Sequence, residues 1–188
     1  MNGRAVIGAR SRSSAARVAL VLVTALIGGC ANLAPLDATA PLISGRLLVR
    51  VDADPPRSLS GEFELRGDAR SGGLRLIGPL GTVAADARWS AAGSSLSTAQ
   101  GRSDFASLDA MTQAALGEAI PLAALFDWLR GRPWPDAPSQ PLAEAAPGFA
   151  QLGWQVDLAR WTDGWVQAQR QTPPRVTVRA RVDQSDPR

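Results

Sequence analysis

The sequence contains no histidine, no lysine and no tyrosine, and it has a single cysteine, Cys30. Without histidine, the chain cannot form a Ser-His-Asp triad, a Cys-His dyad or a histidine-ligated metal site. One cysteine excludes an internal disulfide bond and the cysteine clusters of zinc and iron–sulfur sites. An enzyme, for example a carboxylate-based hydrolase, is one alternative, and we expect the protein not to be an enzyme.

The charge of the chain is concentrated at one end. Its 188 residues suffice for one domain or two small ones, and its formal net charge is +3. Four of the 20 basic residues and none of the 17 acidic ones lie in residues 1–29, so residues 30–188 carry a formal charge of −1. We therefore expect no nucleic-acid partner once that segment is removed.

The first thirty residues have the three-part layout of a secretory signal. Arginines precede an apolar core of ten residues at 18–27, which is followed by Gly28, Gly29 and Cys30. The core is too short to cross a bilayer, which takes roughly 20 residues. This ending resembles a bacterial lipobox, in which small residues precede a cysteine that is acylated and becomes the new N-terminus. We predict a signal peptide at residues 1–29 and lipidation of Cys30; an ordinary signal peptide with a chance cysteine is the alternative.

The segments that flank the predicted domain are small. Residues 30–44 are predicted to form the acylated N-terminus and a flexible tether, because they hold two prolines and mostly small residues. Ala31, and not aspartate, follows the cysteine, which in lipoproteins of this kind implies export to the outer membrane. Residues 184–188 are predicted to be a disordered tail.

Beyond the tether, apolar and polar residues alternate in seven runs that are separated by turn-forming glycine, proline and aspartate. Alternation predicts strands with one wet and one dry face, and hence an antiparallel sheet. The runs are 46–51, 59–66, 74–76, 83–89, 154–158, 166–169 and 175–182.

Two helices are predicted between the fourth and fifth runs. Ser107 is a suitable N-cap for a helix at residues 108–116. A second helix begins near Pro121, and residues 132–147 are predicted to be an irregular loop because they hold five prolines. The apolar stripe of the second helix is Leu122, Leu125, Phe126 and Leu129.

Two short helices cannot cover the dry face of so many strands. The predicted fold is therefore mainly β with α: a strongly curved antiparallel sheet with a helical lid over an apolar cavity. A small barrel with a filled core is the alternative that the pattern leaves open.

Five segments in order resemble the LolB family of outer-membrane lipoprotein-insertion proteins. They are 44–50 (SGRLLVR), 60–65 (SGEFEL), 78–81 (GPLG), 120–133 (IPLAALFDWLRGRP) and 153–157 (GWQVD). The resemblance implies a LolB-like domain at residues 45–183 with a half-open β-barrel of about eleven strands. It also implies that the protein takes triacylated lipoprotein cargo from a soluble, LolA-like periplasmic carrier and inserts it into the outer membrane. Neither a cofactor nor a nucleotide is implied, and a monomer is expected.

One turn carries the sharpest site prediction. Gly78-Pro-Leu-Gly81 fits a type I turn with Pro79 at its second position, which places Leu80 at the tip of a hairpin. From the pattern alone, Leu80 either folds back on the core or protrudes. The resemblance implies that Pro79 and Leu80 protrude and enter the membrane.

The candidate residues for an acyl-chain cavity come from the strands and from the lid, and plain core packing is the alternative for each. They are Leu47, Val49, Phe63, Leu65, Leu76, Trp89, Leu122, Leu125, Phe126 and Leu129. Other functions left open are a soluble carrier of the same fold, against which the lipobox argues, and a structural or assembly lipoprotein whose β-domain binds protein and has no lipid cavity.

Overall fold

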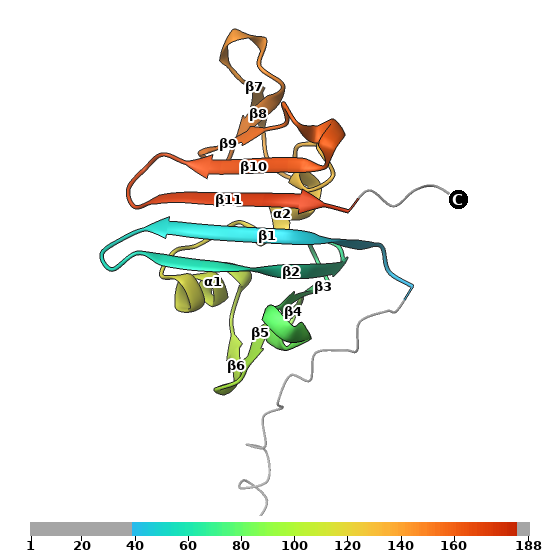
Figure 1. Cartoon of the computed structure of the whole chain (residues 1–188), viewed down its shortest axis with the longest axis vertical. Helices are drawn as coiled ribbons and strands as arrows, with labels where there is room; N and C mark the ends of the chain where they lie inside the picture. Colours follow the sequence, from blue (N-terminus) through green and yellow to red (C-terminus); the bar gives the residue numbers. More distant parts are fainter. Residues whose placement is uncertain (1–38, 184–188) are drawn as a thin grey trace, which may run out of the picture. The chain divides into compact units, whose positions relative to one another are not determined.

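Within residues 39–183, which this computed structural model describes, the chain forms one eleven-stranded antiparallel sheet and two α-helices (Figure 1). The predicted signal peptide, Cys30, most of the predicted tether and the predicted tail lie outside the described residues. The strands are β1 (Leu42–Asp52), β2 (Arg57–Gly67), β3 (Gly72–Ile77), β4 (Val83–Ser90), β5 (Gly93–Thr98), β6 (Gly101–Phe105), β7 (Ser139–Pro141), β8 (Gly148–Gln151), β9 (Trp154–Asp157), β10 (Trp165–Arg170) and β11 (Arg175–Val182). The helices are α1 (Leu108–Leu116) and α2 (Leu122–Trp128).

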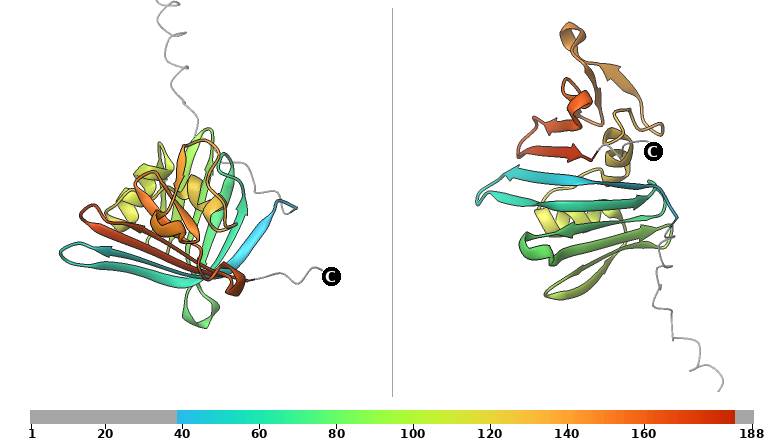
Figure 2. Two further views of the ribbon diagram at one scale, coloured as in Figure 1. Left: turned by 90° about the horizontal axis from the view of Figure 1, so that it is seen from above. Right: turned by 45° about the vertical axis from the view of Figure 1, so that its right-hand side comes forward.

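The strand order puts the first and last strands together in the middle of the sheet. The order is β6-β5-β4-β3-β2-β1-β11-β10-β9-β8-β7, with β1 and β11 paired from Gly45–Val182 to Asp52–Arg175. The two edge strands, β6 and β7, are consecutive in sequence, and α1 and α2 lie between them. The sheet curves around both helices, which therefore sit on its concave side (Figure 2). The prediction of a curved, unclosed sheet with a helical lid is confirmed.

Both helices begin where their start signals predict, and the end of α1 is also where its glycine predicts it. The Ser107 hydroxyl accepts a hydrogen bond from the Ala110 amide, and Gly117 ends α1 in the left-handed conformation with a φ of 79°. The N-cap of α2 is Pro121, and its last helical residue is Trp128. The predicted start of the second helix is thus correct, and Leu129 of the predicted stripe follows directly after the helix.

Two predicted boundaries are wrong. Strand β1 begins at Leu42, so the last three residues assigned to the tether belong to the sheet. The predicted loop at 132–147 contains strand β7, which ends at Pro141. The prolines concealed this strand because they disfavour sheet interiors, yet an edge strand tolerates them since one side of it has no partner to bond.

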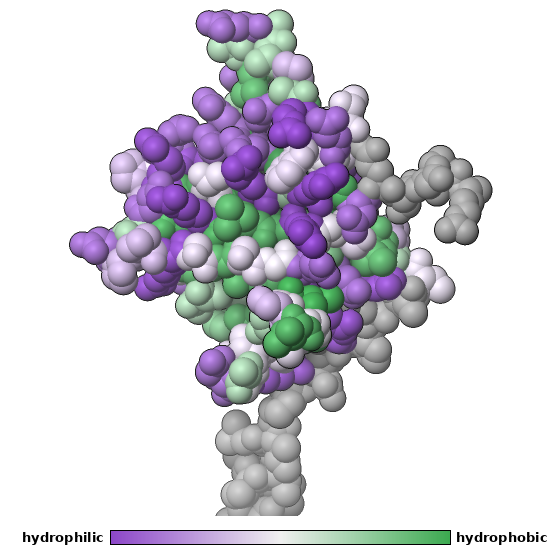
Figure 3. All heavy atoms as spheres, in the orientation of Figure 1, coloured by the Kyte–Doolittle hydropathy of each residue, from purple (hydrophilic) through white to green (hydrophobic). Residues whose placement is uncertain are grey.

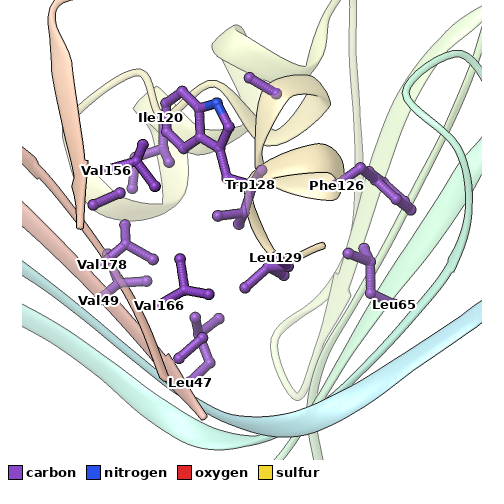
Figure 4. Packing of buried hydrophobic residues seen from close by; sticks show 14 of the residues in the cluster. Leu47, Val49, Leu65, Ile120, Phe126, Trp128, Leu129, Val156, Val166 and Val178 are labelled. Atoms are coloured by element: carbon purple, nitrogen blue, oxygen red, sulfur yellow. The ribbon is translucent and has the colours of Figure 1, made fainter. Parts of the chain in front are cut away.

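The core fills the fold of the sheet below α2 (Figure 4). Phe126 points toward the wall of the sheet that carries Leu65, and Trp128 points toward the wall that carries Val156. The ring of Phe126 meets that of Trp89 edge to face at 5.5 Å between centroids. Aromatic pairs of this geometry add about 0.5–1.5 kcal/mol beyond their buried area. This helix is therefore fixed to both walls of the sheet.

A buried glutamine fixes the segment that follows α2. The Gln151 side chain on β8 accepts hydrogen bonds from Trp128 Nε1 at 2.8 Å and from the Trp134 amide at 2.9 Å. Its own amide group donates to the carbonyls of Trp134 and Ala137, both at 2.8 Å. All its hydrogen-bonding groups are thus used, as a buried polar side chain requires.

Candidate functional site

An apolar cavity of about 280 Å³ lies between the sheet and the two helices. Its wall comes from β1 to β5 and β11, and its cover comes from α1, α2 and the connection between them. The residues that line it are Leu47, Val49, Leu59, Leu74, Leu76, Ala84, Ala85, Ala87, Leu96, Thr98, Met111, Thr112, Ala115, Leu116, Ile120, Leu122, Leu125 and Val178. Only Thr98 and Thr112 of this lining carry a side-chain hydroxyl, so the cavity suits a hydrocarbon.

The structure divides the ten candidate residues into two groups. The five that line the cavity are Leu47, Val49, Leu76, Leu122 and Leu125. The five that pack in the solid part of the core instead are Phe63, Leu65, Trp89, Phe126 and Leu129. The second group lies beside α2, whose bulky side chains fill the space between the walls of the sheet.

Sequence reasoning passed over small residues that make the space. Ala84, Ala85 and Ala87 on β4 line the cavity, as does Ala115 on α1. The alternation along β4 predicts that Ala85 and Ala87 face inward, and a small inward residue leaves room that a larger one would fill. The alternation along β4 could therefore have identified Ala85 and Ala87 from the sequence. The position of α1 over these alanines depends on tertiary packing and could not.

The connection between α1 and α2 is tied to the sheet by charge. Arg170 at the end of β10 donates from Nη2 to Glu118 Oε2 at 2.7 Å, and both side chains are about one-fifth exposed. The same Nη2 donates to the Pro174 carbonyl at 3.2 Å, and the guanidinium stacks on Trp154 at 5.8 Å. A second arginine, Arg57 of β2, packs against Gly117 so closely that a Cβ at that position would collide with it.

One hydrogen bond inside the lid completes this fastening. The buried Thr112 hydroxyl of α1 accepts from the Ile120 amide at 3.0 Å. This bond joins α1 to the connection that leads into α2, and we expect the two helices to move as a unit.

The end of α2 carries a partly buried arginine. Arg130 donates from Nη1 to the Phe126 carbonyl at 3.1 Å and lies over the Phe126 ring at 5.8 Å. Burial, and secondly the charge of Arg132, lower the pKa of Arg130 below its ordinary value. The guanidinium thus donates a hydrogen bond to a carbonyl at the end of the helix, so we assign Arg130 a structural role and not a role in binding a ligand.

The β3–β4 hairpin presents Leu80 to solvent. Its side chain is 100% exposed, and Val83, which follows on β4, is 52% exposed. The Gly81 amide donates to the Gly78 carbonyl at 3.3 Å and closes the turn. Seen along the sheet, this turn projects from the outer, convex side (Figure 2, left). Of the two alternatives for Leu80, folding back on the core is therefore wrong, and the side chain protrudes into solvent.

The predicted turn type is wrong. Leu80 has a φ of 69° and a ψ of 17°, whereas the third residue of a type I turn has a φ near −90°. A leucine in the left-handed region is strained by the close approach of its Cβ to the following carbonyl, at a cost of roughly 1–2 kcal/mol. The exposed leucine is therefore held in an unfavourable backbone conformation with no packing to compensate.

Two other kinds of site can be addressed within residues 39–183. No helix there has the length and apolarity to cross a membrane. Nor does that part of the chain bring three acidic side chains together in a group that could hold a metal ion.

A strongly curved antiparallel sheet whose helices cover an apolar cavity defines a half-open barrel with a helical lid. Comparison with known sequences makes the assignment specific: the family model "Outer membrane lipoprotein LolB" matches residues 42–185. The chain belongs to the LolB family of outer-membrane lipoproteins. This confirms the resemblance seen in the sequence and the predicted location at the outer membrane.

Individual relatives agree over most of the chain. The outer-membrane lipoprotein LolB of Bordetella petrii is 35% identical over 175 residues, which are 85% of this chain and 88% of the relative. The protein of the same name from Ralstonia nicotianae is 34% identical over 162 residues, covering 77% and 78% of the two chains. That of Pseudomonas aeruginosa is 36% identical over a shorter stretch of 94 residues, which are about half of each chain, 48% of this one and 46% of the relative.

Proposed function

We propose that the protein is a chaperone, anchored through Cys30, that receives triacylated lipoproteins from a LolA-like periplasmic carrier and inserts them into the outer membrane without nucleotide. The observation that carries this proposal is the apolar cavity between the sheet and the helices of a LolB-family chain. Leu80, exposed at the tip of the β3–β4 hairpin, supports the second step, which is delivery into the bilayer.

The cavity provides the physical basis for carrying acyl chains. Apolar surface removed from water contributes about 25 cal/mol per Å², whatever the shape of the chain. Because this force is non-directional, many lipoproteins with the same lipid group can share one cavity. The bilayer offers more apolar contact than the cavity does, so cargo release needs no external energy source.

The size of the cavity requires the lid to move. At about 280 Å³, its volume is just below the range for small-ligand pockets, about 300–1,000 Å³. Three acyl chains exceed this space unless α1 and α2 move away from the sheet. This movement would have to break the Arg170–Glu118 ion pair and the Arg57–Gly117 contact.

The test is a two-step transfer assay with purified protein. A carrier loaded with acylated lipoprotein is mixed with the protein, and liposomes are then added. We expect cargo to pass first to the protein and then to the liposomes. Leu80→Glu should accept cargo normally and fail to deliver it, because a charged side chain at the tip opposes entry into the bilayer.

A matched pair of variants tests the cavity itself. Ala85→Phe places a large ring in the cavity and should reduce acceptance of cargo, while Ala114→Phe puts the same ring on an exposed position of α1 and should not. Normal acceptance by Ala85→Phe would refute the cavity as the acyl-chain site. It would favour the alternative, a structural lipoprotein whose β-domain binds protein.

A further inference from the structure

One row of residues crosses the outer face of the sheet from β10 to β4. Strand pairing places Trp165 beside Arg181, Arg181 beside Arg46 and Arg46 beside Glu62. The row continues through Ile77 to Val83, the first residue of β4 after the Leu80 turn. Residues directly opposite in antiparallel strands point to the same face, so these side chains share one surface. A cationic and aromatic end is thus joined to an apolar end.

The cationic end contains an unfavourable pair. Arg46 and Arg181 are opposite each other on the two central strands, where their Cβ atoms are about 4.5–5.5 Å apart. Like charges in this arrangement destabilise a sheet. Arg46 has only an exposed ion pair with Glu62 at 3.5 Å, and Arg181 makes none with any carboxylate among residues 39–183.

A surface hollow of about 860 Å³ opens at these arginines. Its wall consists of Arg46, Arg160, Asp163, Trp165, Arg181, Val182 and Asp183. The carboxylates in it have partners already: Asp163 pairs with Arg160 at 3.3 Å, and Asp183 accepts from the Ser44 hydroxyl at 2.9 Å.

Trp165 gives the hollow a rigid side. The guanidinium of Arg160 lies 5.5 Å from its ring centroid and that of Arg179 lies 5.7 Å away, so the ring holds two further cations near the hollow. Tryptophan between arginines is a combination that suits the boundary between lipid headgroups and acyl chains.

The hollow and the Leu80 turn lie on the same side of the molecule. In the view along the sheet, the turn Pro79–Gly81 and the turn Trp161–Asp163 both project from the outer side (Figure 2, left). In the face-on view, apolar atoms gather over the first turn, and hydrophilic atoms predominate over β10 and over the right-hand ends of β11 and β1, beside an apolar patch in the middle of the sheet (Figure 3). Arg181 is four strands from Val83, or roughly 19 Å at about 4.8 Å per strand. A single bilayer surface can therefore meet both.

We infer that this hollow binds the phosphate groups of anionic lipid headgroups while the Leu80 hairpin enters the bilayer. The inference rests on the proposed function, which supplies the membrane role of Leu80. Guanidinium groups bind phosphate with two parallel hydrogen bonds, and a phosphate placed between Arg46 and Arg181 would relieve their repulsion. The apolar end of the row favours a lipid surface over an acidic protein, since an acidic protein offers nothing for Val83 and Leu80 to enter.

The test uses the protein without its predicted signal peptide, residues 1–29, and with Cys30→Ala, so that neither the apolar signal segment nor an acyl anchor contributes. It measures co-sedimentation with vesicles. One set of vesicles is phosphatidylcholine alone, and the other is phosphatidylcholine and phosphatidylglycerol in equal parts. Arg46→Gln combined with Arg181→Gln should weaken binding to the anionic vesicles by about 10- to 30-fold and leave binding to the neutral ones unchanged. Thermal unfolding should occur at the same or a higher temperature, because the repulsion is gone.

The matched control removes the same charge from the same strands at their other end. Arg50→Gln combined with Arg175→Gln should keep binding to anionic vesicles within about threefold, a change that fits loss of net charge alone. Equal losses in the two double variants would overturn the inference. So would an Arg46/Arg181 variant that binds vesicles normally and no longer accepts cargo from the carrier, since the hollow would then bind an acidic protein surface.

A third variant separates this inference from the proposed function. Leu80→Glu should weaken binding to both kinds of vesicle. If it does so while the Arg46/Arg181 variant binds normally, the headgroup site is refuted and the membrane role of the hairpin stands. If Leu80→Glu binds both kinds like the parent protein, the membrane role itself fails.

Discussion

Replacing Leu80 by glycine should make the protein more stable and less able to deliver cargo. The left-handed backbone at this position costs a leucine roughly 1–2 kcal/mol, and glycine adopts it freely. Glycine also loses about 0.5–1 kcal/mol more than other residues when the unfolded chain is ordered. The side chain is fully exposed, so no packing is lost. We therefore expect the free energy of unfolding to rise by about 0.5–1 kcal/mol.

Delivery should change in the opposite direction. Burial of a leucine side chain in the bilayer contributes up to about 1.5–3 kcal/mol, which corresponds to about 10- to 150-fold in membrane partition. Leu80→Gly loses this contribution without adding charge. Transfer from the protein to liposomes should slow accordingly, while transfer from the carrier to the protein stays normal.

The measurements are urea unfolding and the two-step transfer assay, with a second leucine as control. Leu152 in the β8–β9 turn also has a positive φ, 53°, and it is 46% exposed. Leu152→Gly should relieve similar strain and leave delivery unchanged. The reasoning is refuted if Leu80→Gly unfolds at a lower urea concentration than the parent protein, or if it delivers cargo at the parent rate.

Three further predictions concern the anchor, the lid and the core. Cys30→Ala should yield a soluble or unprocessed protein, and mass spectrometry of the parent N-terminus should show acyl chains; an unmodified cysteine there would contradict the anchor. Glu118→Gln removes the charge that pairs with Arg170 and should lower the free energy of opening the lid by about 1–2 kcal/mol. Hydrogen exchange of the Ile120 amide should then be faster, and unchanged exchange would show that the ion pair does not hold the lid. Gln151→Leu leaves Trp128 Nε1 without its acceptor and should lower the free energy of unfolding by about 3 kcal/mol in a urea titration, and the exposed Gln155→Leu should change it by less than about 0.5 kcal/mol.

The sheet was only partly predictable from the pattern of residues. The seven alternating runs correspond to β1 to β4 and β9 to β11, whose inward side chains are mostly large and apolar. Strands β5 to β8 carry serine, glycine, arginine and proline at many positions, so no apolar alternation marks them. They are the two outermost strands at each end of the sheet, and the edge strands β6 and β7 each have one side without a partner strand. Their number came from the family resemblance, which covered what periodicity could not.

Some features of the candidate site could also be predicted from the local sequence, whereas others depend on tertiary packing. The turn at 78–81 follows from four residues, but they left open whether Leu80 folds back or protrudes, and its exposure was implied by the family resemblance. The left-handed φ of Leu80 does not follow from them either, because proline at the second position fits both type I and type II turns. Inward-facing positions were predicted from alternation. Which of them line the cavity and which pack beside Phe126 depends on where α2 lies, and no local pattern states that.

The β3–β4 hairpin connects the two steps of the proposed cycle. Its strands supply Leu74, Leu76, Ala84 and Ala85 to the cavity wall, and its tip carries Leu80 outside the sheet. The pairing register shifts between Leu76 and Ile77, at the point where the hairpin leaves the wall. A tip held in the bilayer therefore acts on the same two strands that line the proposed acyl-chain cavity. Because a hydrogen-bonded hairpin transmits displacement along its length, entry of Leu80 into lipid and opening of the cavity should be coupled, and cargo would be released where the membrane is already engaged.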